Sequence, residues 1–247
     1  MMQKKIQSDY STLEKELTIV IPAKNEESYI GRILEELSLQ RIGKTQIILA
    51  DAGSTDDTRK IATSTALDLG LNLKIIEGGL PAKGRNSGAK MARTHYVLFV
   101  DADVTFNPQF DLSICLDKIK GKYFVVSTTP TMRNTEDLIA VFMLWLNKLI
   151  SIFLSKTEPF AIGAFTLVDR EIFLGFGGYD EEVKHTEDWL FSKLVPVSRF
   201  LLIPNLITQD NRRFKRFGYL SMVKLMFINW LNRNNRDYFL KDAGYWS

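Results

Sequence analysis

The feature that most constrains the fold is an alternation of apolar strands with helix-forming segments in the first half of the chain. Strands are predicted in LTIVIPA from Leu17, in QIILA at 46–50, in LKII at 73–76 and in VLFV at 97–100. A polar turn and a segment with helical periodicity follow each of the first three strands. Continuous apolar strands separated by helices are typical of a parallel sheet that is covered on both faces. The sequence therefore predicts an α/β fold with a mostly parallel central sheet between two helical layers.

The pattern changes after Gly121. A strand is expected at 123–127, and an apolar segment of 17 residues follows at 138–154. Three polar residues on one helical face interrupt this segment, namely Asn147, Lys148 and Ser151. A helix that crosses a bilayer needs about 20 apolar residues. We therefore expect a helix that either packs into the protein or lies at a membrane surface.

Positive charge is concentrated near the end of the chain. The net charge of +3 combines about −4 for most of the sequence with +7 for residues 211–241, which hold eight basic residues and one acid. An apolar surface and basic clusters in this region are compatible with a membrane interface that contains anionic lipid, or with packing on the catalytic domain. The sequence does not resemble any nucleic-acid-binding module, so we expect no nucleic acid partner.

The cysteine content and the first residues bear on location. The single cysteine, Cys115, excludes an internal disulfide framework and fits a reducing compartment. Residues 1–16 contain charges but no apolar stretch of the kind found in secretory signals, so we expect a short polar tail. These features predict a cytoplasmic protein, with peripheral contact to the inner face of the membrane as a hypothesis.

Polar residues stand at the end of each predicted strand. They are Ala23 to Glu27, Asp51 with Asp56, Lys83 to Asn86, and Asp101 with Asp103. Because loops at the carboxyl ends of parallel strands open at the same edge of a sheet, we expect these residues to converge on one crevice. The pattern predicts a site assembled for a single ligand.

Asp101 and Asp103 indicate a divalent cation. Their side chains, two apart in an extended segment, point the same way and repel each other unless a cation lies nearby. Carboxylate oxygens suit Mg²⁺ or Mn²⁺, which bridge protein carboxylates to substrate phosphates. Lys83 and Arg85 add positive charge for a diphosphate. The sequence has neither a GxxxxGK[ST] loop nor a GxGxxG turn after the first strand, which disfavours P-loop and dinucleotide enzymes.

Five motifs occur in a meaningful order: LTIVIPAKNEE, IILADAGSTDDT, AKGRNSG, VLFVDADV and HTEDWL. Together they resemble glycosyltransferase family 2, whose members have the GT-A fold, a Rossmann-like α/β/α sandwich. The resemblance covers roughly residues 17–216. It implies an inverting, metal-dependent enzyme that moves a sugar from a nucleoside diphosphate sugar, expected to be UDP-linked, to an acceptor hydroxyl.

The resemblance also suggests how the chain is organised. We expect a polar tail at 1–16, a catalytic domain at 17–216 and an amphipathic basic segment at 217–247. Within the catalytic domain, residues 17–127 would form the nucleotide-sugar half and residues 128–216 the acceptor half.

The resemblance implies a nucleotide-binding role for most residues at the crevice. Pro22, Ala23, Asn25 and Glu26 would line the nucleoside pocket, and Asp51 would hydrogen-bond the base. Asp101, Ala102 and Asp103 match the family's Asp-x-Asp motif, which holds the ribose and the metal-bound diphosphate, and Lys83 and Arg85 would lie near the phosphates or the donor sugar. Residues 209–214 loosely resemble the family's Gln-x-x-Arg-Trp loop, so Arg212 or Arg213 would contact the diphosphate, although Phe214 replaces the tryptophan.

The family also places an acidic pair at the start of a helix in the acceptor half, and Glu187 with Asp188 matches it. Asp188 is then the expected general base, which takes the proton of the acceptor hydroxyl as that oxygen attacks the anomeric carbon. The metal and the basic residues would stabilise the departing diphosphate in place of a general acid. His185 is a candidate third metal ligand, although an isolated histidine is more often a hydrogen-bonded loop residue.

Two other functions stay open at this stage. A sugar nucleotidylyltransferase has a related sheet but needs a glycine-rich phosphate loop near its first strand, which PAKNEES lacks. A nucleotide-binding or membrane-scaffold protein would keep the binding residues without turnover. For an active transferase, a lipid-linked or membrane-proximal acceptor is a hypothesis based on residues 138–154 and the basic tail.

Overall fold

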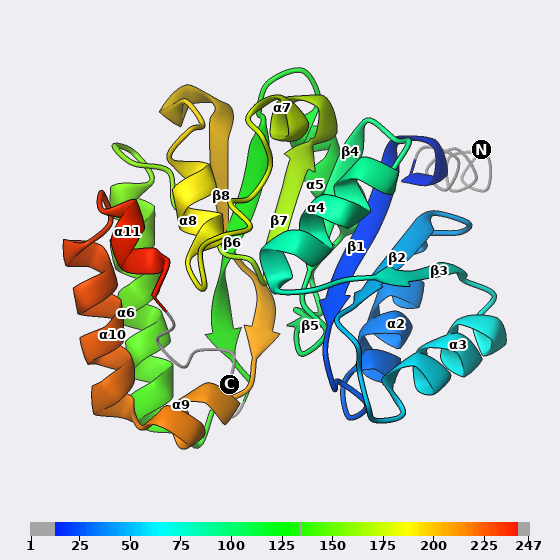
Figure 1. The fold of residues 1–247 in the computed structure, drawn as a ribbon, viewed down its shortest axis with the longest axis horizontal. Coiled ribbons are helices and arrows are strands. Elements are labelled where there is room, and N and C mark those ends of the chain that lie inside the picture. The colour runs from blue at the N-terminus through cyan, green and yellow to red at the C-terminus, as the bar shows by residue number, and fades with distance from the viewer. Residues whose placement is uncertain (1–12, 134, 242–247) are drawn as a thin grey trace.

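The computed structural model describes residues 13–133 and 135–241, with the Arg213 side chain excepted. Eight strands form one sheet in the order β3-β2-β1-β4-β7-β6-β8-β5, with helices on both faces (Figure 1). The strands are β1 Leu17–Ala23, β2 Gln46–Asp51, β3 Asn72–Glu77, β4 Tyr96–Val100, β5 Thr105–Phe106, β6 Val125–Met132, β7 Phe165–Asp169 and β8 Phe200–Gln209. The helices are α2 Ile30–Leu39, α3 Thr58–Asp68, α4 Pro81–Met91, α5 Leu112–Ile119, α6 Leu138–Leu154, α7 Arg170–Gly175, α8 Glu187–Ser192, α9 Arg212–Phe217, α10 Tyr219–Leu231 and α11 Arg236–Phe239.

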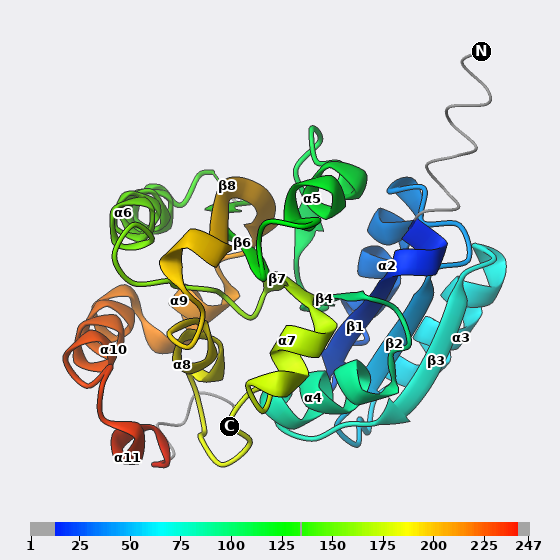
Figure 2. The same cartoon turned by 90° about the horizontal axis from the view of Figure 1, so that it is seen from above.

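The first four long strands form the predicted parallel sheet. β1 pairs in parallel with β2 and with β4, and β2 pairs in parallel with β3. Both faces are covered because successive residues of a strand point to opposite sides. Ile19 and Ile21 of β1 join the core beneath α2 and α5, whereas Val20 joins the core beneath α4 and α7 (Figure 2). The continuous apolar character of these strands thus follows from burial on two sides.

Helix α4 lies very close to β1. A β-carbon added to Gly88 would come within 2.4 Å of the Val20 side chain, so only glycine allows this approach without a shift. The close contact fixes the start of α4, which carries Lys83 and Arg85, over the carboxyl ends of the parallel strands.

The sheet becomes mixed at β7, which is antiparallel to both β4 and β6. Strand β6 is longer than the segment predicted at 123–127, because it continues in parallel with β8 past an irregularity between Thr129 and Thr131. It therefore runs across the expected boundary between the two halves at 127/128. Residues 13–16 are helical and Leu13 is buried, so this end of the expected polar tail packs on the core.

The apolar segment at 138–154 is the single helix α6, as predicted. Figures 1 and 2 both place α6 and α10 along the same edge of the molecule, far from α3. Within residues 13–133 and 135–241, no helix combines the length and the apolar content that crossing a bilayer requires.

Candidate active site

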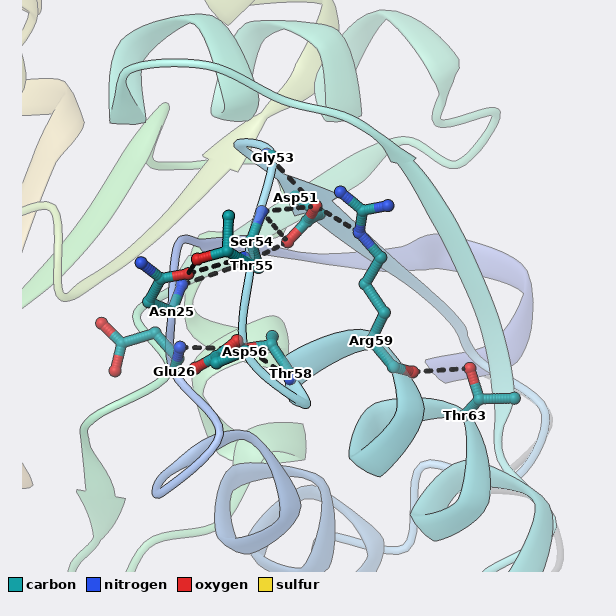
Figure 3. Close-up of polar contacts among 10 residues, drawn as sticks. All are labelled: Asn25, Glu26, Asp51, Gly53, Ser54, Thr55, Asp56, Thr58, Arg59 and Thr63. Carbon is teal, nitrogen blue, oxygen red and sulfur yellow. Dashed lines mark hydrogen bonds and ion pairs between the residues drawn. The ribbon is translucent and has the colours of Figure 1, made fainter.

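Asp51, at the end of β2, organises the loop that follows it. Its carboxylate accepts hydrogen bonds from the backbone N–H of Gly53 at 3.2 Å and of Ser54 at 3.1 Å, and from Arg59 Nε at 2.6 Å (Figure 3). Burial opposes the charge of Asp51, but the hydrogen bonds from Ser54 and Arg59 outweigh it and lower the pKa of the carboxyl. Asp51 is therefore a fixed anion at the crevice.

Asn25 ties the loop after β1 to the loop after β2. Its backbone has a φ of 53°, in the left-handed region that asparagine tolerates better than most residues. Its N–H donates to Ser54 Oγ at 2.9 Å, and its Oδ1 accepts from the N–H of Thr55 at 2.9 Å (Figure 3). Glu26 adds a third tie, because its N–H donates to Thr58 Oγ1 at 2.8 Å. The two loops thus form one wall.

Two adjoining cavities open at this edge of the sheet, with volumes of about 570 and about 550 Å³. The first is lined by Asp51, Gly53, Arg59 and Lys83, among others. The second is lined by Pro22, Ala23, Asn25, Glu26, Asp101, Ala102, Asp103, Arg212, Arg216 and Phe217, among others. Both include Ala52 and Gly79. The structure therefore brings together residues from every strand end singled out in the sequence.

Arg85 is not among the residues that line these cavities and instead lies beneath them, 2% exposed. Its Nη2 donates to Asp101 Oδ1 and its Nη1 donates to Glu187 Oε1, each at 2.7 Å. Burial disfavours the charged guanidinium, but the two carboxylates outweigh that effect and raise the pKa of Arg85. The residue is a buried cation that joins the Asp-x-Asp motif to the acidic pair of α8.

The space for this guanidinium comes from Gly163, in the loop before β7. A β-carbon at this position would lie 2.6 Å from Arg85 Nη2. The same backbone segment holds the predicted base, because the N–H of Gly163 donates to Asp188 Oδ2 at 2.5 Å. Gly163 thus positions both the bridging arginine and Asp188.

Asp188 differs from Glu187 in its surroundings. Glu187 is buried and its charge is engaged by Arg85, whereas Asp188 is partly exposed and is held by two backbone N–H groups, those of Gly163 and Trp189. Burial and the neighbouring Glu187 raise the pKa of Asp188, and Arg85 counteracts them only in part. A carboxylate with a raised pKa is a stronger proton acceptor, so of the pair Asp188 is suited to act as a base.

Arg212 connects the C-terminal region to the crevice. Its Nη2 lies 2.8 Å from Asp103 Oδ2 and its Nη1 lies 3.6 Å from Glu26 Oε2. The guanidinium also stands over the Tyr29 ring, 4.7 Å from its centroid. Of the two arginines singled out in the sequence, Arg212 therefore reaches the Asp-x-Asp motif, whereas the side chain of Arg213 lies outside the described part of the chain.

Glu26 is a half-buried carboxyl of the second cavity. Burial raises its pKa to about 7; Asp103 and Asp101 act in the same direction, and Arg212 opposes them. Three carboxylates, those of Glu26, Asp101 and Asp103, and three basic side chains, those of Lys24, Arg212 and Arg216, line the same cavity. Carboxylate oxygens such as those of Asp101 and Asp103 are the ligands that Mg²⁺ and Mn²⁺ take together with phosphate oxygens.

His185, the third metal ligand considered from the sequence, has aromatic surroundings. Its ring is 2% exposed and packs against Tyr238 and Phe239, with centroid distances of 5.9 and 5.2 Å. In the described part of the chain, no cluster of three or more His, Cys, Asp or Glu side chains is placed to bind a metal ion. The aromatic packing gives no support to a ligand role for His185, and the metal itself stays a prediction.

Sequence reasoning missed several residues of the site. Arg59 pairs with Asp51 from the first turn of α3, and its spacing after the strand was a usable signal. Gly163, Arg216 and Phe217 carry no local motif, since their roles depend on segments that are distant in sequence.

Comparison with known proteins identifies the family. Residues 18–175 match the family described as glycosyl transferase family 2. The chain belongs to glycosyltransferase family 2. The family and the class of enzyme predicted from the five motifs are therefore confirmed.

A relative in Staphylococcus aureus (strain bovine RF122 / ET3-1), named 4,4'-diaponeurosporenoate glycosyltransferase, is 30% identical over 182 residues, which is 69% of this chain and 48% of that protein. The chain thus spans about half the length of the curated relatives it matches.

Solved structures confirm the GT-A fold. The S. aureus protein TarS (residues 1–349), crystallised with UDP-GlcNAc, has a TM-score of 0.59 at 21% identity and covers 80% of this chain and 59% of its own. The mannosyltransferase PcManGT from Pyrobaculum calidifontis, crystallised with GDP-Man and Mn²⁺, has a TM-score of 0.61 at 19% identity, over 91% of this chain and 71% of its own.

The Arg85 bridge yields a first prediction. Replacing Arg85 by methionine leaves two carboxylates, those of Asp101 and Glu187, without their buried cation. We expect the free energy of unfolding to fall by about 3–5 kcal/mol, measured by denaturant titration. The control is Lys90→Met, on the same helix as Arg85, which removes an exposed lysine whose Nζ lies 3.9 Å from Glu181 Oε1. This change should lower the free energy of unfolding by less than about 1 kcal/mol. Equal losses in the two variants would contradict the bridge, and adding Glu187→Gln to Arg85→Met should recover part of the loss.

The raised pKa of Glu26 yields a second prediction. The folded protein holds the Glu26 proton up to about pH 7, whereas an ordinary glutamate in the unfolded chain releases it near 4.5. The folded state therefore binds more protons in this window, and the contribution of Glu26 to stability falls as the pH rises through it. Glu26→Gln should remove that slope. Above pH 7 in metal-free buffer, its free energy of unfolding, measured by denaturant titration, should exceed that of wild type by about 1–3 kcal/mol. The exposed neighbour provides the control, since Glu27→Gln should retain the wild-type slope; a Glu26→Gln curve parallel to wild type would disprove the assignment.

Proposed function

We propose that this protein is an inverting, metal-dependent glycosyltransferase that moves a sugar from a nucleoside diphosphate sugar to an acceptor hydroxyl. One observation carries the proposal: buried Arg85 binds both Asp101 and Glu187. Asp101 lines the second cavity, where the donor would bind, and Glu187 is the residue next to Asp188. A donor-binding carboxylate and a proton acceptor are thus fixed relative to each other. This is what a direct displacement between donor and acceptor requires.

The proposed step begins with the acceptor hydroxyl at Asp188. Asp188 takes the hydroxyl proton while the oxygen forms a bond to the anomeric carbon, on the face opposite the diphosphate. The bond between the anomeric carbon and the diphosphate oxygen breaks, and the leaving nucleoside diphosphate keeps the electron pair. Attack from the opposite face inverts the configuration of the sugar. Arg212 and Lys83 offer positive charge to the departing group.

Asp101 and Asp103 are the residues that would hold Mn²⁺ or Mg²⁺. When bound, the ion would supply positive charge to the diphosphate oxygens. Both carboxylates line the second cavity. Mn²⁺ accompanies GDP-Man in the similar mannosyltransferase structure.

The nature of donor and acceptor is part of the proposal. We expect a UDP-linked donor with its base near Asp51, whose carboxylate lines the first cavity. Similar structures hold UDP-GlcNAc and GDP-Man, so both nucleotides belong in a binding screen. For the acceptor we propose a lipid-linked or membrane-proximal hydroxyl compound. The relative named for 4,4'-diaponeurosporenoate supports an apolar acceptor class.

Of the alternatives, the nucleotidylyltransferase has lost its support because the chain belongs to another family. A protein that binds nucleotide without turnover is separated by hydrolysis of the donor. Wild type with Mn²⁺ should slowly hydrolyse a UDP- or GDP-sugar identified by thermal shift, and Asp103→Ala should not. The exposed carboxylate variant Asp68→Ala, on α3, is the control and should hydrolyse at the wild-type rate. Failure of wild type to turn over a donor that it binds, with acceptor extracts present, would favour the binding protein.

The role of Asp188 is tested by its amide. Asp188→Asn keeps the size but cannot take up the proton. Its single amide oxygen can accept from only one of the two N–H groups that Asp188 binds, those of Gly163 and Trp189. We expect the rate of transfer to fall by about 10²–10⁴, with the dissociation constant of the donor changed less than about threefold, as isothermal titration would measure. Transfer at the wild-type rate would refute the assignment.

A further inference from the structure

Helices α6 and α10 expose an unusual amount of apolar surface. Large apolar side chains exposed on α6 are Leu138, Ile139, Phe142, Trp145, Leu146, Leu149, Ile150 and Phe153, and those on α10 are Leu220, Val223, Met226, Phe227, Trp230 and Leu231. We call these fourteen residues the α6–α10 face. They outnumber the nine other large apolar side chains exposed in the described part of the chain. An apolar patch of this extent marks an interaction surface.

Each helix buries one polar side chain while it exposes large apolar ones, although Ser221 and Lys224 of α10 are exposed as well. On α6, Ser151 is buried and its hydroxyl lies 3.5 Å from Asn147 Oδ1. On α10, Asn229 is buried and its Oδ1 accepts from the Tyr238 hydroxyl at 3.2 Å. A helix that packs on a water-soluble core normally turns its polar side outward. Buried polar residues together with exposed large apolar residues on the same helices indicate that the medium outside this face is apolar.

A small shared core keeps the helices in this orientation. Ala140 of α6 packs with Met222 of α10, Phe214 of α9 and Met132 of β6. These contacts leave the fourteen residues of the α6–α10 face exposed. The face is therefore part of the fold rather than a packing defect at one residue.

The charges around the face select its partner. Neither α6 nor α10 contains an aspartate or a glutamate, and each contains one lysine, Lys148 and Lys224. Lys148 is half-buried, whereas Lys224, Lys156 beyond the end of α6 and Lys215 in α9 are exposed. Trp145 and Trp230 add side chains that favour the boundary between headgroups and acyl chains. The flanks of α6 also carry acids, Glu136, Asp137 and Glu158. Apolar and aromatic residues on two helices that contain lysine and no acid match an anionic bilayer surface.

A second copy of this chain fits less well. Two α6–α10 faces in contact would bring Lys148 and Lys224 of both copies into one interface with no acid on either helix to pair with them. Charges of the same sign oppose such an association, whereas anionic lipid attracts them.

We propose that α6 and α10 lie in the interface of an anionic lipid bilayer and anchor the protein peripherally. Figures 1 and 2 show both helices along one edge of the molecule, so they can enter the same plane together. Helix α9 leads from this edge to the second cavity, which Arg212, Arg216 and Phe217 line. The docked protein thus presents its cavity beside the membrane. This inference extends the proposed membrane-proximal acceptor, but anchoring does not depend on turnover.

Vesicle flotation tests the proposal with the full chain. The probes are vesicles of pure phosphatidylcholine and vesicles with equal parts of phosphatidylcholine and phosphatidylglycerol. Wild type should float with the anionic vesicles, and the double variant Ile150→Glu/Phe227→Glu should bind them about tenfold or more weakly. Both positions are exposed, so folding should be preserved, which circular dichroism checks. Leu67→Glu, at an exposed leucine of α3 on the far side, is the matched control and should bind like wild type.

Two further measurements sharpen the outcome. Brominated lipid should quench tryptophan fluorescence in wild type, and Trp145→Phe/Trp230→Phe should lose most of that quenching. Absence of flotation, or equal flotation by the glutamate double variant, overturns the proposal. So does a wild-type dimer that the double variant converts to a monomer without any vesicle binding. Donor hydrolysis measured in the same samples keeps the proposed function separate, because a wild type that hydrolyses the donor but does not bind anionic vesicles refutes only the membrane surface.

Discussion

The buried ion pair network of Arg85 is the interaction on which the site depends. A guanidinium removed from water is strongly destabilising unless carboxylates surround it, and here one comes from the end of β4 and the other from α8. The parallel half and the mixed half of the sheet are therefore held together by charge as well as by the pairing of β4 with β7. Moving either carboxylate would leave the buried Arg85 guanidinium with one anionic partner fewer. The network thereby fixes the distance between the proposed donor site and the proposed base.

The charge balance of the crevice follows from the same arrangement. Arg85 pairs with Asp101 inside the protein, while Arg212 pairs with Asp103. The Nη1 atom of Arg212 also lies 3.6 Å from Glu26 Oε2. Arg212 comes from α9, at the start of the C-terminal region, and is partly exposed, so its contact is less costly to break than that of Arg85. A diphosphate that enters the cavity offers Arg212 an alternative anion, whereas Arg85 has no comparable freedom. One arginine is thus structural, and the other is available to the ligand.

The parallel half of the fold could be predicted because its signals are local. Apolar runs such as 97–100, each followed by polar residues, define both the strands and the crevice, and Asp51, Asp101 and Asp103 meet there as expected. The bridging role of Arg85 could not be predicted, since it depends on Gly163 leaving space and on Glu187 arriving from a distant helix. The outward orientation of α6 was equally hidden. Periodicity identifies the apolar side of a helix, but not the side that the rest of the protein covers.

Helix α9 connects the two surfaces that the molecule presents. Phe214 belongs to the small core beneath α6 and α10, whereas Arg212, two residues earlier, contacts the Asp-x-Asp motif. Phe217 takes part in both, because it packs on that core and lines the second cavity. A short helix with contacts on both sides cannot shift at one without changing the packing at the other. An acceptor held in a bilayer at the α6–α10 face would therefore approach the cavity along α9, where the ligand-accessible cations of the site are also located.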